Sequence, residues 1–246
     1  MKKIGIVGGI GWQSTVDYYS DLCHRAEQQS LAPNSRRAPS TPEMSIESLD
    51  IQKAISYLGS DDDEASWAKF DEYHRMALLR LAVSGADFAL LASNTPHHRF
   101  ATIVRGVGIP VIDLYAVIAE HCARIDPGRV LVLGTAFTMK SQRLRNAFAR
   151  FGVDATAPQG VAEQEVVQLI ADLHVNRLAD AAERIARIAR ISFAQSAAPQ
   201  TVCLACTELL LAYPQYRRTA SFNVDGVRYT NASALHMNAA FDLAMQ

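Results

Sequence analysis

The sequence predicts an α/β protein composed of two similar domains, each with a parallel sheet. Apolar runs of strand length alternate with amphipathic stretches of helix length along most of the 246 residues, which is typical of parallel sheets. The first run, 4–9, is almost continuously apolar, as expected for a strand that is covered on both faces. A strand that runs into a glycine turn opens the chain and recurs at 129–135, which indicates an internal duplication.

In the first half, strand-like runs are separated by stretches of helical periodicity. The expected elements are, in order, a strand at 4–9, a helix at 15–27, a strand at 44–51, a helix at 65–84, a strand at 87–92, a short strand at 108–113 and a helix at 116–124. The acidic run 59–64 is expected to be the solvated start of the long helix. A stretch rich in Pro, Ser and Arg, 30–42, is expected to be a mobile loop beside the functional site.

The second half repeats the alternation of strands and helices. Its expected elements are a strand at 129–134, a helix that exposes Arg143 and Arg145, helices at 163–173 and 178–195, a strand at 201–206, a polar hairpin around 223–226 and an alanine-rich terminal helix. We predict that residues 1–100 plus 208–246 form the first domain and that residues 101–207 form the second.

Composition and charge restrict the classes of partner. With 49% hydrophobic and 20% charged residues, the chain can bury a substantial core in one large or two small domains. A formal net charge of -1 provides no long-range field that would attract nucleic acid or an acidic membrane surface, so neither is expected as a partner. No apolar run approaches the roughly 20 residues of a membrane-spanning helix. Because a strand follows directly after Lys3, we expect a cytoplasmic protein.

Chemically reactive residues follow two of the expected strands. The polar residues 206–208 follow the apolar run 201–205, and the polar residues 93–95 follow the run 87–92. The carboxyl ends of parallel strands are where α/β proteins place ligands and chemistry. Cys206 is therefore the first candidate for a reactive residue, and a buried inert thiol is the alternative.

The pair Cys203 and Cys206 has the spacing of a redox or zinc motif, but neither function is expected. Cys203 lies within the apolar run and should face away from Cys206 or into packing. No second Cys or His pair at ligand spacing completes a metal site. A reducing compartment also disfavours structural disulfides.

The glycine-rich turn at 8–15 does not match a dinucleotide-binding fingerprint. Gly9 and Gly11 are followed by Ser14, and no obvious second strand ends in an acidic residue at the required distance. A nicotinamide cofactor is therefore not expected. The turn still allows backbone N–H groups and the helix start to approach an anion such as a carboxylate.

Five short motifs, taken in order, resemble the aspartate/glutamate racemase family. They are GGIGWQST at 8–15, SNTPH at 93–97, GTAFTM at 134–139, CTE at 206–208 and NASALH at 231–236, and they span almost the whole chain. The resemblance implies two similar α/β domains related by a pseudo-twofold axis, with the active site between them. It also implies racemisation without pyridoxal phosphate or a metal, and a homodimer.

In this family, two cysteines flank the substrate α-carbon, one removing its proton and the other delivering a proton to the opposite face. The matching residues here are Cys206 and Ser93. A thiol can be tuned toward neutral pH by positive neighbours or N–H groups, whereas an unassisted serine is too weakly acidic, so we expect Cys206 to be the base and Ser93 a donor or water relay. With Trp12 in its glycine turn, the chain is similar to a subgroup that prefers L-aspartate and L-glutamate, and we expect faster turnover of the L form. His97 and His236 either orient the thiol or are core histidines.

The resemblance also implies contacts with a small acidic amino acid. The residues concerned are Gly9, Ile10, Asn94, Thr95, Thr135, Thr207 and Glu208. Glu208 is expected either to hold the substrate ammonium group or to cap the following helix. The candidates for binding the distal carboxylate are Arg36, Arg37 and Lys140.

Two other functions remain open at the level of sequence. Arylmalonate decarboxylases are similar in keeping only the second cysteine, which reprotonates one face of a carbanion. Alternatively, the chain is a degenerate racemase that binds an acidic amino acid without turning it over. Release of carbon dioxide from a malonate would identify a decarboxylase. Thermal stabilisation by an acidic amino acid without α-proton exchange would identify a binding protein.

Overall fold

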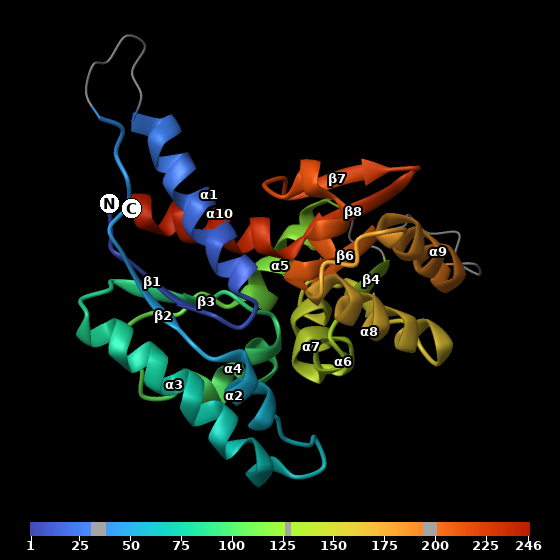
Figure 1. The fold of residues 1–246 in the computed structure, drawn as a ribbon, viewed down its shortest axis with the longest axis horizontal. Coiled ribbons are helices and arrows are strands. Elements are labelled where there is room, and N and C mark those ends of the chain that lie inside the picture. Colours follow the sequence, from blue (N-terminus) through green and yellow to red (C-terminus); the bar gives the residue numbers. More distant parts are fainter. Residues whose placement is uncertain (31–37, 126–128, 194–200) are drawn as a thin grey trace. The chain divides into compact units, whose positions relative to one another are not determined.

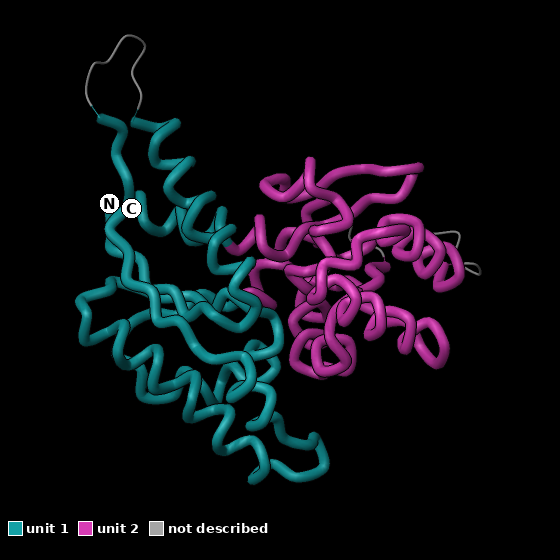
Figure 2. The backbone as a smooth tube through the Cα atoms, in the orientation of Figure 1, with its two compact units in different colours: residues 1–113, 237–246 teal, residues 114–236 magenta. Residues whose placement is uncertain are grey.

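The computed structural model falls into two compact units (Figure 2). Unit 1 contains residues 1–113 and 237–246, and unit 2 contains residues 114–236. The residues that the structure describes are 1–30, 38–125, 129–193 and 201–246.

This division differs from the predicted domain boundaries at both junctions. Residues 101–113 belong to unit 1 because Val111 forms a parallel bridge with Ala89. Residues 208–236 belong to unit 2 because they include a strand that pairs with the strand leading to Cys206. Local sequence patterns identify strands but do not show which sheet each strand joins.

Unit 1 is built on a parallel sheet with the strand order β2-β1-β3 (Figure 1). Its strands are β1 (Ile4–Gly8), β2 (Met44–Ser48) and β3 (Phe88–Leu91). In the central strand, Ile4 pairs with Met44 on one side and with Phe88 on the other. All residues of β1 and β3 are buried, as the continuous apolar pattern predicts for strands covered on both faces.

Unit 1 contains the helices predicted at 15–27 and 65–84, with shifted ends, and further short helices that were not predicted. They are α1 (Trp12–Ser30), α2 (Ile51–Ser56), α3 (Ala68–Val83), α4 (Phe100–Ile103) and the 3₁₀ helices η1 (Glu64–Trp67) and η2 (Thr95–Arg99). Asp50, predicted within a strand, is instead the N-cap of α2, and its Oδ1 accepts the backbone N–H of Gln52 at 2.7 Å. This capping explains why β2 ends before Asp50.

Unit 2 contains a five-stranded sheet with the order β5-β4-β6-β8-β7 (Figure 1). Its strands are β4 (Arg129–Gly134), β5 (Asp154–Thr156), β6 (Thr201–Ala205), β7 (Ser221–Val224) and β8 (Val227–Asn231). All neighbours are parallel except β7 and β8, which form the predicted hairpin. Its turn residues Asp225 and Gly226 have φ angles of 50° and 79°, the left-handed geometry that two-residue hairpin turns favour.

The helices of unit 2 include one that continues into unit 1. They are α5 (Leu114–Ile125), α6 (Ala136–Lys140), α7 (Gln142–Ala149), α8 (Val161–His174), α9 (Ala181–Phe193), α10 (Ala232–Met245) and the 3₁₀ helices η3 (Thr207–Ala212) and η4 (Pro214–Tyr216). The helices predicted at 163–173 and 178–195 correspond to α8 and α9. The last helix, α10, begins in unit 2 and ends in unit 1.

Two hydrophobic clusters flank the sheet of unit 2. Val202, Leu204 and Cys206 join residues of α8 and α9 in one cluster, whereas Cys203 and Ala205 join residues of α5 and α7 in the other. Successive residues of a strand face opposite sides of the sheet, so Cys203 points away from Cys206, as predicted. Cys203 is packed in the core and is a free cysteine.

Both sheets arrange their first three strands in the same way. In unit 1 the chain's first strand, β1, lies between the second and the third, and in unit 2 β4 holds the same position between β5 and β6. The residues singled out by the sequence follow the third strand in each case. This shared order is what an internal duplication predicts.

Candidate active site

The carboxyl end of β6 positions Cys206. Gly134 pairs with Ala205 in the parallel register of β4 and β6, so Thr135 and Cys206 follow next to each other at the same sheet edge. Cys206 retains an extended backbone, with φ of -149° and ψ of 131°, and is the N-cap residue of η3. The residue is only 5% exposed, so its thiol lies under the surface of unit 2.

The thiol of Cys206 has a specific acceptor, the carboxylate of Glu208. Sγ donates a hydrogen bond to Oε2 of Glu208 at 2.9 Å, and Oγ1 of Thr207 donates to the same oxygen at 2.9 Å. Glu208 is 8% exposed. Glu208 lies in the first turn of η3, and its carboxylate accepts the hydrogen bonds of the thiol and the Thr207 hydroxyl.

This environment favours the protonated thiol. Burial raises the pKa of the Cys206 thiol well above its usual range, and the negative charge of Glu208 and the hydrogen bond to it raise the pKa further. The backbone N–H groups of Glu208 and Leu209 lower the pKa but are outweighed. The N–H donors that could stabilise a thiolate are nevertheless present, and tuning of the thiol toward neutral pH stays a prediction.

His174 extends the contact from the thiol toward solvent. Its Nε2 lies 3.4 Å from Oε1 of Glu208, and its Nδ1 lies 2.9 Å from the carbonyl oxygen of Ile170 in the preceding turn of α8. The histidine side chain is 37% exposed. No motif surrounds His174, and it lies one residue beyond the helix predicted at 163–173, so the sequence offered no signal for this contact.

Thr135, next to Cys206 in the register, caps the short helix α6. Its Oγ1 accepts the backbone N–H of Thr138 at 3.4 Å and lies 3.1 Å from the hydroxyl oxygen of Thr138. Thr135 and Thr207 are both partly exposed. Two hydroxyl groups therefore accompany the thiol at this edge of the unit 2 sheet.

Unit 1 presents Ser93 at the equivalent place. Val7 pairs with Leu91 in the parallel register of β1 and β3, so the segments that carry Gly9 and Ser93 leave the same edge of the sheet. Ser93 is partly exposed and Asn94 is buried. Thr95 and Ile10 are partly exposed. Each unit thus brings its own set of predicted site residues together at the carboxyl edge of its sheet.

The glycine turn of unit 1 is closely packed. Gly9 has a φ of 87°, and its N–H donates to Oγ1 of Thr15 at 2.8 Å. A Cβ atom at this position would lie 2.1 Å from the carbonyl oxygen of Leu49. Glycine is therefore required by both the backbone conformation and the approach of the loop after β2.

Gly9→Ala is expected to destabilise the protein by about 2–5 kcal/mol, because a left-handed non-glycine residue costs about 1–2 kcal/mol and overpacking about 1–3 kcal/mol more. The measurement is the midpoint of thermal unfolding. Gly106→Ala is the matched control, since Gly106 has a φ of 79° but open space around its Cβ position, and it should cost only about 1–2 kcal/mol. Equal effects of the two variants would contradict the packing argument.

The two histidines considered as thiol-orienting groups are both fully buried. In unit 1, His97 stacks on Phe100 with ring centroids 5.4 Å apart, and its Nε2 lies 3.4 Å from the carbonyl oxygen of Leu91. These contacts make His97 a core histidine beneath the Ser93 turn. His236 lies in the part of α10 that belongs to unit 2.

One of the three candidates for binding a distal carboxylate is described. Nζ of Lys140 lies 2.9 Å from Oε1 of Glu163, so its charge is already paired. Lys140 and Glu163 line a hollow of about 460 Å³ beside β4 and β5. Arg36 and Arg37, with most of the predicted loop 30–42, lie outside the described residues.

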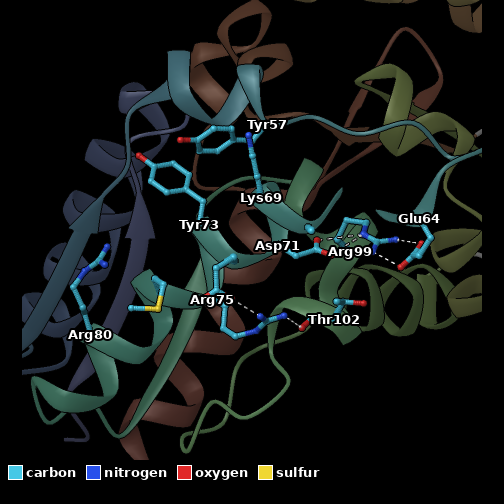
Figure 3. A pocket seen from close by; sticks show the side chains of 12 residues that line it. Tyr57, Glu64, Lys69, Asp71, Tyr73, Arg75, Arg80, Arg99 and Thr102 are labelled. Carbon is cyan, nitrogen blue, oxygen red and sulfur yellow. Dashed lines mark hydrogen bonds and ion pairs between the residues drawn. The ribbon is translucent and has the colours of Figure 1, made fainter. Parts of the chain in front are cut away.

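A larger groove of about 970 Å³ runs along α3 in unit 1 (Figure 3). Its arginines are engaged by neighbouring carboxylates: Arg75 contacts Glu72 at 2.5 Å, and Arg99 contacts Glu64 and Asp71. Arg75 also donates to the carbonyl oxygen of Thr102 at 2.7 Å. Both arginines are therefore held by ion pairs within unit 1, and Ser93 is not among the residues that line the groove.

The family model for Asp/Glu/hydantoin racemases matches residues 7–240. This chain belongs to the Asp/Glu/hydantoin racemase family. The match includes the Ser93 edge of unit 1 and the Cys206 edge of unit 2, and it confirms the resemblance drawn from the five motifs.

Solved structures of racemases share the fold. An aspartate racemase homologue from Pyrococcus horikoshii OT3 is 25% identical with a TM-score of 0.74, and 100% of each chain is covered. Picrophilus torridus aspartate racemase is 18% identical with a TM-score of 0.73, covering 100% of this chain and 95% of that chain. Glutamate racemase from Campylobacter jejuni subsp. jejuni is 14% identical with a TM-score of 0.62, covering 98% of this chain and 85% of that chain. The α/β fold class predicted from the sequence is thereby confirmed.

Family membership supports an isomerase of the racemase class. Within the described part of the chain, no three His, Cys, Asp or Glu side chains are grouped so that they could hold a metal ion. In the same residues, no helix has both the length and the apolar character needed to cross a membrane.

Proposed function

We propose that this family member is a cofactor-independent amino-acid racemase that interconverts L- and D-aspartate or glutamate by exchanging the α-proton. Cys206 is the thiol acid/base, and Ser93 occupies the slot that serves the opposite face of the α-carbon. The observation that carries the proposal is the hydrogen bond of 2.9 Å from the Cys206 thiol to Glu208. A thiol that acts in proton transfer needs an acceptor for its own proton, and Glu208 is that acceptor.

Proton transfer to Glu208 converts the buried thiol into a base. The S–H bond breaks, its electron pair stays on sulfur, and Oε2 of Glu208 receives the proton. The backbone N–H groups of Glu208 and Leu209 stabilise the resulting thiolate. The thiolate then takes the α-proton, and the electron pair of the broken C–H bond spreads into the substrate carboxylate. The Ser93 hydroxyl, or a water molecule that it positions, gives up a proton to form the new C–H bond on the opposite face, and solvent returns a proton to that donor.

The substrate carboxylate that accepts this charge needs hydrogen-bond donors in fixed positions. We assign this role to polar groups at the two sheet edges: Asn94, Thr95, Thr135 and Thr207. Gly9 and Ile10 line the turn beside Ser93, where Gly9 permits close approach while its own N–H is bonded to Thr15. Acidic amino acids are the substrate class favoured by the names of the similar solved proteins, which are aspartate and glutamate racemases.

The direct test is proton NMR of L-aspartate and, separately, L-glutamate in D2O with the purified protein and no added cofactor. We expect the α-proton signal to disappear with time for at least one substrate and chiral analysis to detect the D enantiomer. Exchange without any D product would indicate a thiol base that lacks a working partner at Ser93. If neither substrate exchanges, the racemase proposal is wrong, and stabilisation by the same ligands would then indicate a binding protein.

The Ser93 hydroxyl is a weaker acid/base group than the Cys206 thiol, so Ser93 is expected to limit the reaction of the D enantiomer. Ser93→Cys is expected to increase α-proton exchange of the D substrate by about tenfold or more, since a thiol is far more acidic than a serine hydroxyl. The measurement is the initial rate of deuterium incorporation into the D and L forms. Ser93→Ala is the control and should not accelerate the D form. An unchanged D rate in Ser93→Cys would remove Ser93 from the proposed slot.

A further inference from the structure

In the proposed mechanism, Cys206 must lose the proton that it takes from each substrate molecule. Each α-proton that the thiolate removes must leave before the next cycle, yet Cys206 is 5% exposed and cannot exchange freely with water. A route from sulfur to solvent is therefore required if the thiol is to act repeatedly.

Three side chains of unit 2 form such a route. Exposure increases along it from 5% at Cys206 to 9% for the Glu208 side chain and 37% for the His174 side chain. The contacts are 2.9 Å from Sγ to Oε2 of Glu208 and 3.4 Å from Oε1 to Nε2 of His174. The two oxygens of one carboxylate thus face the thiol and the imidazole.

The orientation of the imidazole suits a proton acceptor. Nδ1 lies 2.9 Å from the carbonyl oxygen of Ile170, which has no proton to give, so Nδ1 must carry the proton of that hydrogen bond. In the neutral ring Nε2 then has a free electron pair, and this nitrogen faces Glu208. The last turn of α8 therefore fixes the tautomer that can receive a proton from the carboxyl group.

We propose that His174 is a positioning residue that returns Cys206 to its working state by passing the proton from Glu208 to solvent. This inference rests on the proposed racemase function. The thiol proton moves to Oε2 of Glu208, and rotation of the carboxyl group exchanges the places of its two oxygens. The O–H bond then breaks, its electron pair stays on Glu208, and the proton binds to Nε2 of His174. The imidazolium releases that Nε2 proton to water, which restores the neutral ring.

The test compares α-proton exchange in wild-type protein, His174→Gln and His24→Gln in a buffer that shuttles protons poorly. Glutamine retains hydrogen-bonding groups but cannot take a proton, so His174→Gln should reduce exchange by about tenfold. Added imidazole in the millimolar range should restore most of the lost rate, because the histidine site is open to solvent. His24 is the matched control: its side chain is 43% exposed, it neighbours Glu27, and it lies on α1 of unit 1. His24→Gln should match the wild type with and without imidazole.

The outcomes separate this inference from the racemase proposal. Loss of exchange in His174→Gln with rescue by imidazole supports the relay, since a misplaced Cys206 would not be restored by a small base. Exchange at the wild-type rate, or a loss that imidazole does not restore in a variant of unchanged melting temperature, overturns the relay while the racemase stands. Absence of exchange in the wild-type protein overturns both.

Discussion

Cys206→Ala is expected to reduce α-proton exchange of L-aspartate or L-glutamate by at least about 10³-fold, because it removes the proposed acid/base group itself. Glu208 keeps its place in this variant but has no thiol to act on. The measurement is deuterium incorporation at the α-carbon under the conditions of the wild-type assay. Thermal unfolding of the same sample shows whether the fold survives the substitution.

Cys203→Ala provides the matched control for this loss. Cys203 lies on the same strand, three residues earlier, and is fully buried on the opposite face of the sheet. Its replacement removes one sulfur atom from the core, which should cost about 1 kcal/mol of stability and leave exchange within about twofold of wild type. Retained exchange in Cys206→Ala would refute the assignment of the base, and equal losses in both variants would indicate a general effect of core packing.

Glu208→Gln is expected to lower the pKa of the Cys206 thiol and also to slow α-proton exchange. The negative charge of Glu208 and the hydrogen bond to it raise the pKa of the Cys206 thiol, in addition to burial. Removing the charge should therefore lower the pKa, so thiolate forms at a lower pH than in the wild-type protein. Exchange should nevertheless fall by about 10²-fold, because glutamine cannot accept the thiol proton.

Two measurements test this pair of effects. The pH dependence of Cys206 alkylation, followed by mass spectrometry of the peptide that contains it, should reach its midpoint at a lower pH in Glu208→Gln than in the wild type. Deuterium exchange gives the rate. Glu165→Gln is the control, because Glu165 also lies in unit 2 but pairs with Arg184 and Arg187, and neither its alkylation midpoint nor its exchange rate should change. A Glu208→Gln variant that exchanges as fast as wild type would show that Glu208 is not the proton acceptor.

The strand β6 could be predicted from the sequence, but its pairing with β8 could not. The apolar run before Cys206 predicted a buried strand with Cys203 facing away, and both are confirmed. Period-two alternation is a local property, so it can be derived without knowing the partner strands. The pairing of β6 with β8 joins segments that are separated in the chain, and for that reason the division of the structure into two units differs from the predicted boundary near residue 208.

Glu208 shows the limit of local patterns for chemistry. Its position two residues after Cys206 suggested an ammonium ligand or a helix cap, and both proposals considered only the chain around it. The structure instead brings the thiol and His174 to its two oxygens. His174 comes from the end of α8, more than thirty positions away, and no sequence motif marks that contact.

The sequence by itself determined the α/β class, the duplicated strand plan, the family and the two strand ends that carry Ser93 and Cys206. These features follow from short-range periodicity and from motifs that lie within a few residues of one another. Tertiary structure alone decided the burial that favours the protonated thiol and the contact of His174 with Glu208. Burial depends on which distant side chains meet in space, and it raises the pKa of the Cys206 thiol more than Glu208, its neighbour in the chain, does.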